Sequence, residues 1–427
     1  MPSSMVSPDS RRALRLNIVE GAFAVASDNL AGPYLTLFAM SLGATPSQIG
    51  MLSAFPNLLG NILQIPFGML AEKVRDKRIL CIIGGFLART SWVLIAVLPF
   101  LFTPEKRMAA VIVLASLRIV AANLGGPAWT DLQAGIVPRA IRGKYYANRN
   151  VVLNISALVV TLAAGLVLAL RFPINYYILF IGAAILGVAS TSVFRQIPFP
   201  PPARKEAGAG GSAGVRFAGF VKAALQNKDF VNYGISAVIW NFGVTFLGSL
   251  TAVYFVQDLG GNEGAWALVN ASSLAAQIVC QRYWGPLADK FGPKNIMAVS
   301  GIAVCFIPAL WFLAPTSWVG IVINFISGFA WGGYNLAAFN LLLELTPDEN
   351  RSMYIGAYNT FMGIATSVGP VLGGFTAEFF GLRSIFLVSF AVRAFGLFLF
   401  NRGVSDFGYR KPRRQDLLPM RRPARML

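Results

Sequence analysis

Histidine is absent from the chain, and charged residues are scarce. Without imidazole, no histidine can act as a metal ligand, proton relay or general base near neutral pH. The three cysteines, Cys81, Cys280 and Cys305, lie inside apolar runs without metal-ligand spacing, so we interpret them as packing residues and expect no disulfide framework. Charged residues make up 13% of the chain, against about 25% in typical soluble proteins. No constellation of nucleophile, base and metal ligands is visible, and we predict that the protein is not an enzyme and needs no metal or cofactor.

Long apolar runs dominate what is present. Hydrophobic residues make up 56% of the 427 residues, with 33 Phe and 42 Gly. A helix needs about 20 mainly apolar residues to cross a bilayer core, and twelve such runs occur. They cover approximately residues 14–40, 48–70, 79–102, 108–132, 146–170, 174–194, 230–256, 265–288, 296–314, 318–343, 353–380 and 385–400. The composition therefore predicts an all-α integral membrane protein with twelve transmembrane helices.

The basic residues are distributed unevenly between alternate loops. If the N-terminus is cytoplasmic, most of the 36 Lys and Arg residues fall in cytoplasmic segments, and the outer loops hold only Lys106, Arg107, Arg171 and Arg383. This bias follows the positive-inside rule. It predicts a multi-pass protein of the cytoplasmic (inner or plasma) membrane with both termini cytoplasmic. The net charge of +18 then reports topology, so no nucleic-acid partner is expected, and the basic tail is expected to contact anionic inner-leaflet lipids.

A linker divides the chain into two halves of six runs each. Residues 195–229 are rich in Pro and then Gly, and end in an amphipathic stretch at 215–229 that is typical of a helix on the membrane surface. We therefore expect a first half at 1–194, this linker, a second half at 230–402 and a basic tail at 403–427.

The two halves repeat short motifs at matching positions. The loop after the second run contains Gly68, Glu72, Lys73 and Asp76, and the loop after the eighth contains Gly285, Asp289, Lys290, Gly292 and Lys294. After the fourth and tenth runs, a Pro is followed at the same spacings by Arg, Tyr and Asn, which end at Asn150 and Asn359. These repeats predict two similar helical halves, and we expect the two charged loops to act as a cytoplasmic gate. A solvated loop that only obeys the positive-inside rule is the alternative.

With these motifs the sequence resembles the major facilitator superfamily of secondary transporters over residues 11–402. Glu72 and Arg75 depart from the Asp and Gly usual in the first loop. The run from Arg118 to Gly125 and Gly126 is similar to a pattern of proton-coupled members. The Gly369-Pro370 and Gly373-Gly374 segment is similar to one that drug/proton antiporters carry in the fifth span, although here it lies in the eleventh. The resemblance implies a monomer with two pseudo-symmetric six-helix halves that works by alternating access.

A few ionisable residues lie at bilayer depth, where charge is costly and tends to be functional. Asp28 and Arg118 each lie about midway along their runs at 1.5 Å per residue, and Glu20 lies nearer the cytoplasm. In the family that the sequence resembles, the first and fourth spans line the central cavity. We therefore expect Asp28, with Glu20, to work with Arg118 in proton coupling. A static buried ion pair is the alternative, and Arg89 and Arg393 are interpreted as helix-contact residues.

Amide and aromatic side chains provide candidates for a substrate-binding wall. Such groups suit a small organic solute, although Asn and Gln also join membrane helices directly. The candidates are Asn29, Tyr34, Asn57, Asn61, Gln64, Asn150, Asn154, Trp240, Asn241, Gln277, Gln281, Trp331, Tyr334, Asn335 and Asn359.

The sequence predicts a secondary transporter that exports a small organic solute, driven by the proton gradient, since no nucleotide-binding loop is present. A sugar or organic-anion importer or uniporter of the same fold is the first alternative. A membrane sensor that does not transport is the second.

Overall fold

The computed structural model describes residues 8–137, 142–199, 226–346, 351–405, 409, 412 and 416. This part of the chain contains helices and no strand, which confirms the all-α class. The helices before the linker are α1 (Pro8–Ala31), η1 (Gly32–Tyr34), α2 (Leu35–Ser41), α3 (Pro46–Lys73), α4 (Lys77–Leu101), α5 (Pro104–Leu124), α6 (Gly126–Ile136), α7 (Arg142–Leu168) and α8 (Ile174–Arg195). Those after it are α10 (Lys228–Leu247), α11 (Leu250–Gln257), α12 (Glu263–Phe291), α13 (Pro293–Phe312), α14 (Val319–Leu345), α15 (Arg351–Phe380) and α16 (Ser384–Gly403).

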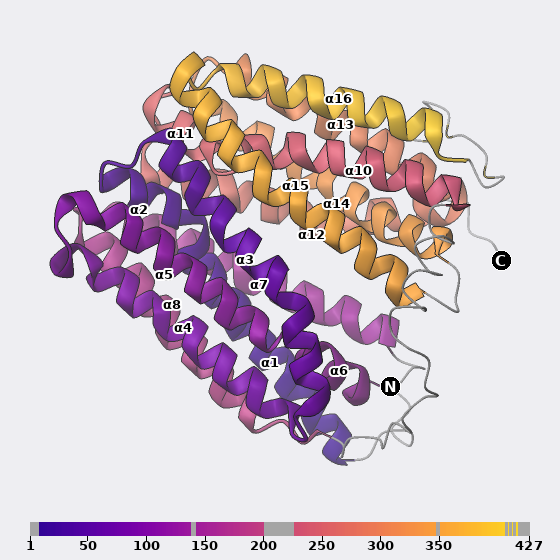
Figure 1. Ribbon diagram of the computed structural model, residues 1–427, viewed down its shortest axis with the longest axis horizontal. Helices are drawn as coiled ribbons and strands as arrows, with labels where there is room; N and C mark the ends of the chain where they lie inside the picture. The colour runs from indigo at the N-terminus through magenta and orange to yellow at the C-terminus, as the bar shows by residue number, and fades with distance from the viewer. Residues whose placement is uncertain are drawn as a thin grey trace, which may run out of the picture.

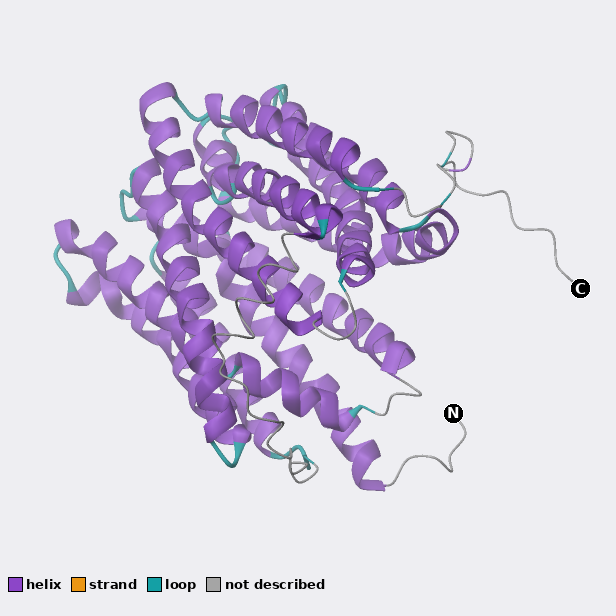
Figure 2. Ribbon diagram, turned by 45° about the vertical axis from the view of Figure 1, so that its right-hand side comes forward, coloured by secondary structure: helices purple, strands orange, loops and turns teal. Residues whose placement is uncertain are grey.

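The helices pack in two groups, α1–α8 and α10–α16 (Figures 1 and 2). We call the end at which α8 finishes and α10 begins the linker end, and the end at which α2 leads into α3 the far end. In Figure 1 the two groups approach each other around α2 and α11 and diverge toward the linker end. The α3–α15 and α7–α12 pairs join the groups.

The contacts that join the groups lie toward the far end. The hydroxyl oxygens of Ser53 and Ser249 are 2.5 Å apart, and the Asn175 amide donates to the Glu263 carboxylate at 3.1 Å. Glycines allow the backbones of α3 and α15 to approach closely here, since a Cβ on Gly374 would lie 2.6 Å from the Pro46 carbonyl oxygen. The structure is therefore closed at the far end.

Three predicted spans are interrupted. The first breaks at Gly32–Tyr34 because Pro33 lacks a backbone N–H, the fourth breaks at Gly125, and the seventh breaks at Gly248. Seven helical segments in the described residues are long and apolar enough to cross a membrane: Lys77–Leu101, Pro104–Thr130, Asn148–Leu168, Ile174–Arg195, Lys228–Gln257, Pro293–Phe312 and Ser384–Gly403. The count of twelve spans and the cytoplasmic termini stay predictions. Residues 215–225 of the expected surface helix and most of the basic tail lie outside the described residues, and Lys228 and Asp229 already belong to α10.

Candidate functional site

A cavity of about 420 Å³ lies within the first group of helices. Its wall comes from α1, α4, α5, α6, α7 and α8, and most of it consists of small or apolar side chains. Five charged residues also line it, namely Glu20, Asp28, Arg89, Arg118 and Arg149. The three charged residues assigned to proton coupling, Glu20, Asp28 and Arg118, therefore line one cavity together with Arg89 and Arg149.

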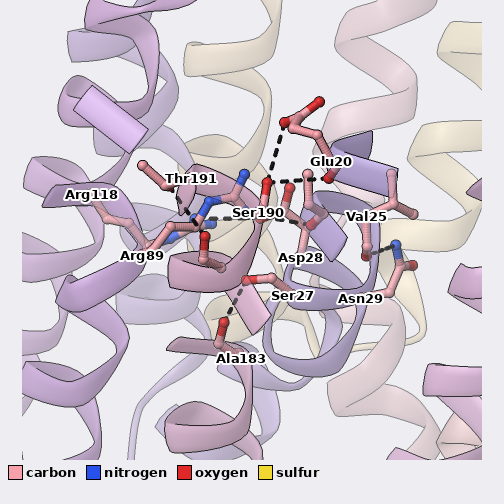
Figure 3. A network of polar contacts seen from close by, with 12 residues as sticks. Glu20, Val25, Ser27, Asp28, Asn29, Arg89, Arg118, Ala183, Ser190 and Thr191 are labelled. Atoms are coloured by element: carbon pink, nitrogen blue, oxygen red, sulfur yellow. Dashed lines mark hydrogen bonds and ion pairs between the residues drawn. The ribbon is translucent and has the colours of Figure 1, made fainter. Parts of the chain in front are cut away.

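Asp28 faces two guanidinium groups across this cavity (Figure 3). Its Oδ1 lies 3.5 Å from Nη1 of Arg89 and 3.8 Å from Nη1 of Arg118. The Asp28 side chain is 54% exposed, whereas those of Arg89 and Arg118 are 16% and 14% exposed. The carboxylate is therefore open to the cavity, whereas the two guanidinium groups that contact it are largely buried.

The two arginines are held in place by their own helices and neighbours. Arg89 donates to the carbonyl oxygen of Ala24 at 3.3 Å, which ties α4 to α1. The Arg118 guanidinium lies 4.3 Å from the ring centroid of Trp92, a cation–π geometry that fixes its plane. Trp92 is fully buried, so α4 and α5 together position the charge opposite Asp28.

Glu20 forms a second, more buried pair, and its partner is Arg149 rather than the expected Arg118. Glu20 Oε2 lies 3.9 Å from Nη2 of Arg149, and Ser190 donates to Oε1 at 3.2 Å. Oε2 is buried and accepts no hydrogen bond from the described residues. Glu20 is therefore compensated by charge but incompletely hydrogen-bonded.

Arg149 is fixed by a chain of polar contacts. Its Nε donates to Asn17 at 2.8 Å, and the Asn17 amide in turn donates to Gln133 at 2.5 Å. Gly21 makes room for it, because a Cβ at that position would lie 2.5 Å from Nη2 of Arg149. The chain joins α1, α6 and α7 on the linker-end side of the cavity.

The wall contributed by α1 follows from helical spacing. Gly21, Ala24, Val25 and Asp28 follow an i, i+3, i+4, i+7 pattern and so lie on one helix face. The small residues Gly21 and Ala24 leave part of the volume that the cavity occupies.

Of the fourteen predicted wall residues whose side chains the structure describes, none lines this cavity. Several amides instead donate to the carbonyl four residues earlier in their own helix: Asn29 to Val25, Asn57 to Ser53 and Asn241 to Ala237. Such local bonds satisfy an amide without a ligand.

The remaining wall candidates lie elsewhere. Tyr34, Trp240 and Tyr334 are buried in core clusters, and Trp331 packs edge-on against Tyr334. Five side chains are exposed, namely Asn57, Gln64, Asn150, Asn335 and Asn359, and Asn61, Asn154 and Gln277 are half-buried. The side chain of Gln281 lies outside the described set.

Comparison with known proteins now places the chain in a family. The sequence profile of the Major Facilitator Superfamily matches residues 21–279 and 233–424. The chain belongs to this superfamily. It is therefore a multi-pass membrane protein, and the fold agrees. A nucleoside transporter, NupG, superposes with a TM-score of 0.72 at 14% identity over 90% of this chain and 99% of that one. A D-xylose–proton symporter gives 0.68 at 14% identity, over 93% and 98%.

Relatives by sequence include efflux pumps. The multi-drug resistance efflux pump PmrA of Streptococcus pneumoniae is 32% identical over 140 residues, which are 31% of this chain and 34% of PmrA. Its homolog in Lactococcus lactis is 28% identical over 190 residues, 41% of this chain and 45% of the relative. The matches thus span between a third and a half of these relatives.

The two loops predicted to form a cytoplasmic gate lie at the linker end. A closed gate would bring Gly68 and Gly285 into close helix contact and let Glu72 and Asp289 cap helices or pair with Arg. A Cβ on either glycine would meet nothing within 4 Å, and both carboxylates are exposed with no ion pair among the described residues. The two groups are separated at this end in this conformation, and the gate role of the two loops stays a prediction. Lys73, in the same loop, is exposed as well.

Asp76 is the residue that caps a helix in the first loop. Its carboxylate accepts from the backbone N–H of Arg78 at 3.1 Å and from the guanidinium at 2.8 Å, at the start of α4. The hydrogen bond from Arg78 lowers the pKa of Asp76 below its usual value.

In the second loop, Lys290 lies 3.7 Å from Asp416 of the tail, and Lys294 is buried. Gly292 has φ +77°, a left-handed backbone that favours glycine. Tyr409 covers it, and its hydroxyl donates to Glu344 at 3.3 Å. The tail therefore packs on the loop that the sequence assigned to gating.

Two cavity arginines were missed as site residues. Arg149 lies within the predicted run 146–170 but was not singled out as a site residue. Because α7 begins at Arg142, Arg149 lies about two turns inside the helix. Arg89 was interpreted as a packing residue, yet it is nearer to Asp28 than Arg118 is. The excess of arginine over carboxylate within the spans was the available signal.

Proposed function

We propose that this Major Facilitator Superfamily protein exports a small organic solute across the cytoplasmic membrane in exchange for protons. The observation that supports this most directly is the half-exposed Asp28 carboxylate between Arg89 and Arg118 in the cavity. Among the described lining residues, Asp28 is the more exposed of the two acids, since Glu20 is buried. Without histidine, these two carboxylates are the proton carriers of the proposal.

The exchange would use competition at Asp28. With the far end closed, the predicted orientation opens the cavity region to the cytoplasm, where an ionised Asp28 contacts the solute. When the groups rock and the far end opens, a proton from outside neutralises Asp28, weakens its attraction for the solute and is carried inward. A monomer with no cofactor suffices for this cycle.

Export is supported by the relatives named as multi-drug efflux pumps, with matches confined to part of their length. The wall of the cavity is mostly apolar, with small residues such as Gly21, Ala24 and Ala122. Such a wall suits an organic solute with a substantial apolar body.

Import of an organic anion is the second candidate, and the charges of the cavity favour it specifically. Three guanidinium groups face two carboxylates among the described lining residues, so one positive charge is uncompensated. Protonation of Asp28 would raise the positive charge further and strengthen anion binding. An anion and a proton would then bind together and travel in the same direction.

Vesicle transport distinguishes the two. A solute is first identified by thermal shift of the purified protein against drugs, sugars and organic anions, since a binder stabilises the folded form. That solute is then added to the medium outside inside-out membrane vesicles whose interior is acidic, and its uptake into the vesicles is measured. Proton-coupled export predicts gradient-driven uptake into these vesicles. Uptake only when the gradient is reversed would refute export and support the importer.

A further inference from the structure

A second cavity, of about 280 Å³, lies at the far end of the first group of helices. It is bounded by the end of α2, the end of α4, the start of α5 and the turn between α7 and α8. Phe100, Phe172 and Tyr177 supply aromatic walls, and Arg107 supplies the charge. The cavity contains no residue of the proposed transport site, and the transport cycle above does not use it.

The guanidinium of Arg107 is held rigidly at this cavity. Its Nη2 donates to the Pro99 carbonyl oxygen at 2.9 Å and its Nε to that of Phe102 at 3.1 Å, which also satisfies the last turn of α4. These bonds use two of the five N–H groups of the side chain. Exposed Glu105, two residues earlier, attracts Arg107 but forms no ion pair with it within 4 Å in the described part of the chain, so the remaining N–H groups of Arg107 are available to an anion.

A buried hydroxyl lies in the same wall. Tyr177 packs against Phe100 with ring centroids 5.4 Å apart. Its hydroxyl is buried and has no hydrogen-bond partner among the described residues. A buried polar group without a partner is costly, so an acceptor oxygen entering the cavity would be stabilised here.

The basic residues at the far end cluster around this cavity. The sequence assigns only four to the outer loops, and Arg107 lines the cavity while Lys106 and Arg171 are adjacent in sequence to lining residues. The fourth, Arg383, belongs to the second group of helices. Since the rest of the chain keeps basic residues away from this end, the exceptions indicate a local requirement for positive charge.

Large apolar side chains extend from the cavity along the outside of the helices. Phe100 and Leu101 are 71% and 67% exposed, and Phe172 and Ile174 are also exposed. An aromatic rim with a cation at the end of membrane-spanning helices matches the depth at which headgroups meet acyl chains. A soluble anion would use the charge but would not cover these side chains.

We propose that this cavity binds the phosphodiester headgroup of an anionic phospholipid in the outer leaflet. The phosphate would accept from Arg107 and from the Tyr177 hydroxyl, and the acyl chains would lie over Phe100, Leu101 and Ile174. Guanidinium groups bind phosphate oxygens with charge-assisted hydrogen bonds.

Native mass spectrometry of the full chain tests this by titration with phosphatidylglycerol. We expect Arg107→Met to weaken binding of the tightest lipid by roughly tenfold, the effect of one lost charge-assisted hydrogen bond. Tyr177→Phe, which removes only the hydroxyl, should weaken it a few-fold. Arg383→Met is the matched control and should bind as the wild type does. Arg107→Met could fail to fold because α4 loses its cap. In that case, weaker lipid binding by Tyr177→Phe and Arg171→Gln would support the proposal, and unchanged binding by both would refute it.

Two outcomes would overturn the proposal. Unchanged lipid affinity in the Tyr177 and Arg107 variants, or an equal loss in Arg383→Met, would show that no specific site exists here. Glycerol 1-phosphate and inorganic phosphate serve as soluble probes in a parallel thermal-shift series. Arg107-dependent stabilisation by these probes, without retention of phosphatidylglycerol, would assign the cavity to a soluble phosphate compound.

Discussion

Replacement of Gly374 by Ala should shift the protein away from the conformation described here. Gly374 lies where α15 crosses α3 at the far end, and an added Cβ would lie 2.6 Å from the Pro46 carbonyl oxygen and 3.0 Å from the Ser47 Cα. The helices would have to separate by roughly half an ångström or more, and such overpacking costs about 1–3 kcal/mol. The clash exists only while the far end is closed, so the equilibrium should shift about 5- to 150-fold toward opening.

Spin labels at Glu72 and Asp289 report this shift. Both side chains are exposed at the linker end, one on each group of helices, and the three cysteines can be replaced first. The distances between the two spin labels, measured by electron paramagnetic resonance, should include a larger short-distance population in Gly374→Ala than in the wild type, because opening the far end brings the linker ends of the two groups together. Gly234→Ala in α10 is the control, because its added Cβ would meet nothing within 4 Å. Identical distance distributions in the two variants would refute the conclusion that the α3–α15 contact at Gly374 stabilises the closed far end.

Two further predictions concern stability. The hydrogen bond from Arg78 lowers the pKa of Asp76 below its usual value of 3.8. The cap therefore stabilises the fold fully at pH values above 3.8, and this stabilisation is lost as the pH falls through the folded-state pKa of Asp76. The gap in Tm between wild type and Asp76→Ala should therefore narrow in acid, and a gap that stays constant from about pH 6 to pH 2.5 would contradict this. The second prediction concerns Arg393, which is buried and donates to the Val304 carbonyl oxygen at 3.2 Å. Among the described residues, its Nε has no hydrogen-bond partner and its guanidinium forms no ion pair with a carboxylate. Arg393→Met should be neutral or stabilising, by up to about 4 kcal/mol, in thermal unfolding, and a clear loss of stability would show that the charge is compensated.

The fold could be predicted because it depends on composition and repetition along the chain. Apolar runs of sufficient length, the Pro- and Gly-rich linker and the repeated loops indicate two groups of membrane helices before any contact is known. The breaks at Gly32–Tyr34 and Gly248 were missed because an apolar run reports burial in lipid and says little about a local change of helix direction.

The site was only partly predictable, for a geometric reason. Position along the helices predicted that Asp28 and Arg118 lie at the same depth in the bilayer. In the structure, Oδ1 of Asp28 lies 3.8 Å from Nη1 of Arg118. Depth does not specify which face of each helix is turned inward. Arg149 was therefore not singled out, and Glu20 was assigned to Arg118 although it pairs with Arg149. The amides were overvalued because a side chain can satisfy itself within its own helix, as Asn57 does with Ser53.

Gradient-driven transport by Asp28→Asn tests the central claim most directly. The substitution keeps the shape of the side chain and removes the titratable group, and Asp258→Asn, at an exposed position after α11, makes the same chemical change away from the cavity. In proteoliposomes with an imposed pH gradient, wild type and Asp258→Asn should concentrate the solute, and Asp28→Asn should only equilibrate it. An Asp28→Asn protein that reaches the wild-type accumulation ratio would contradict proton coupling through this carboxylate.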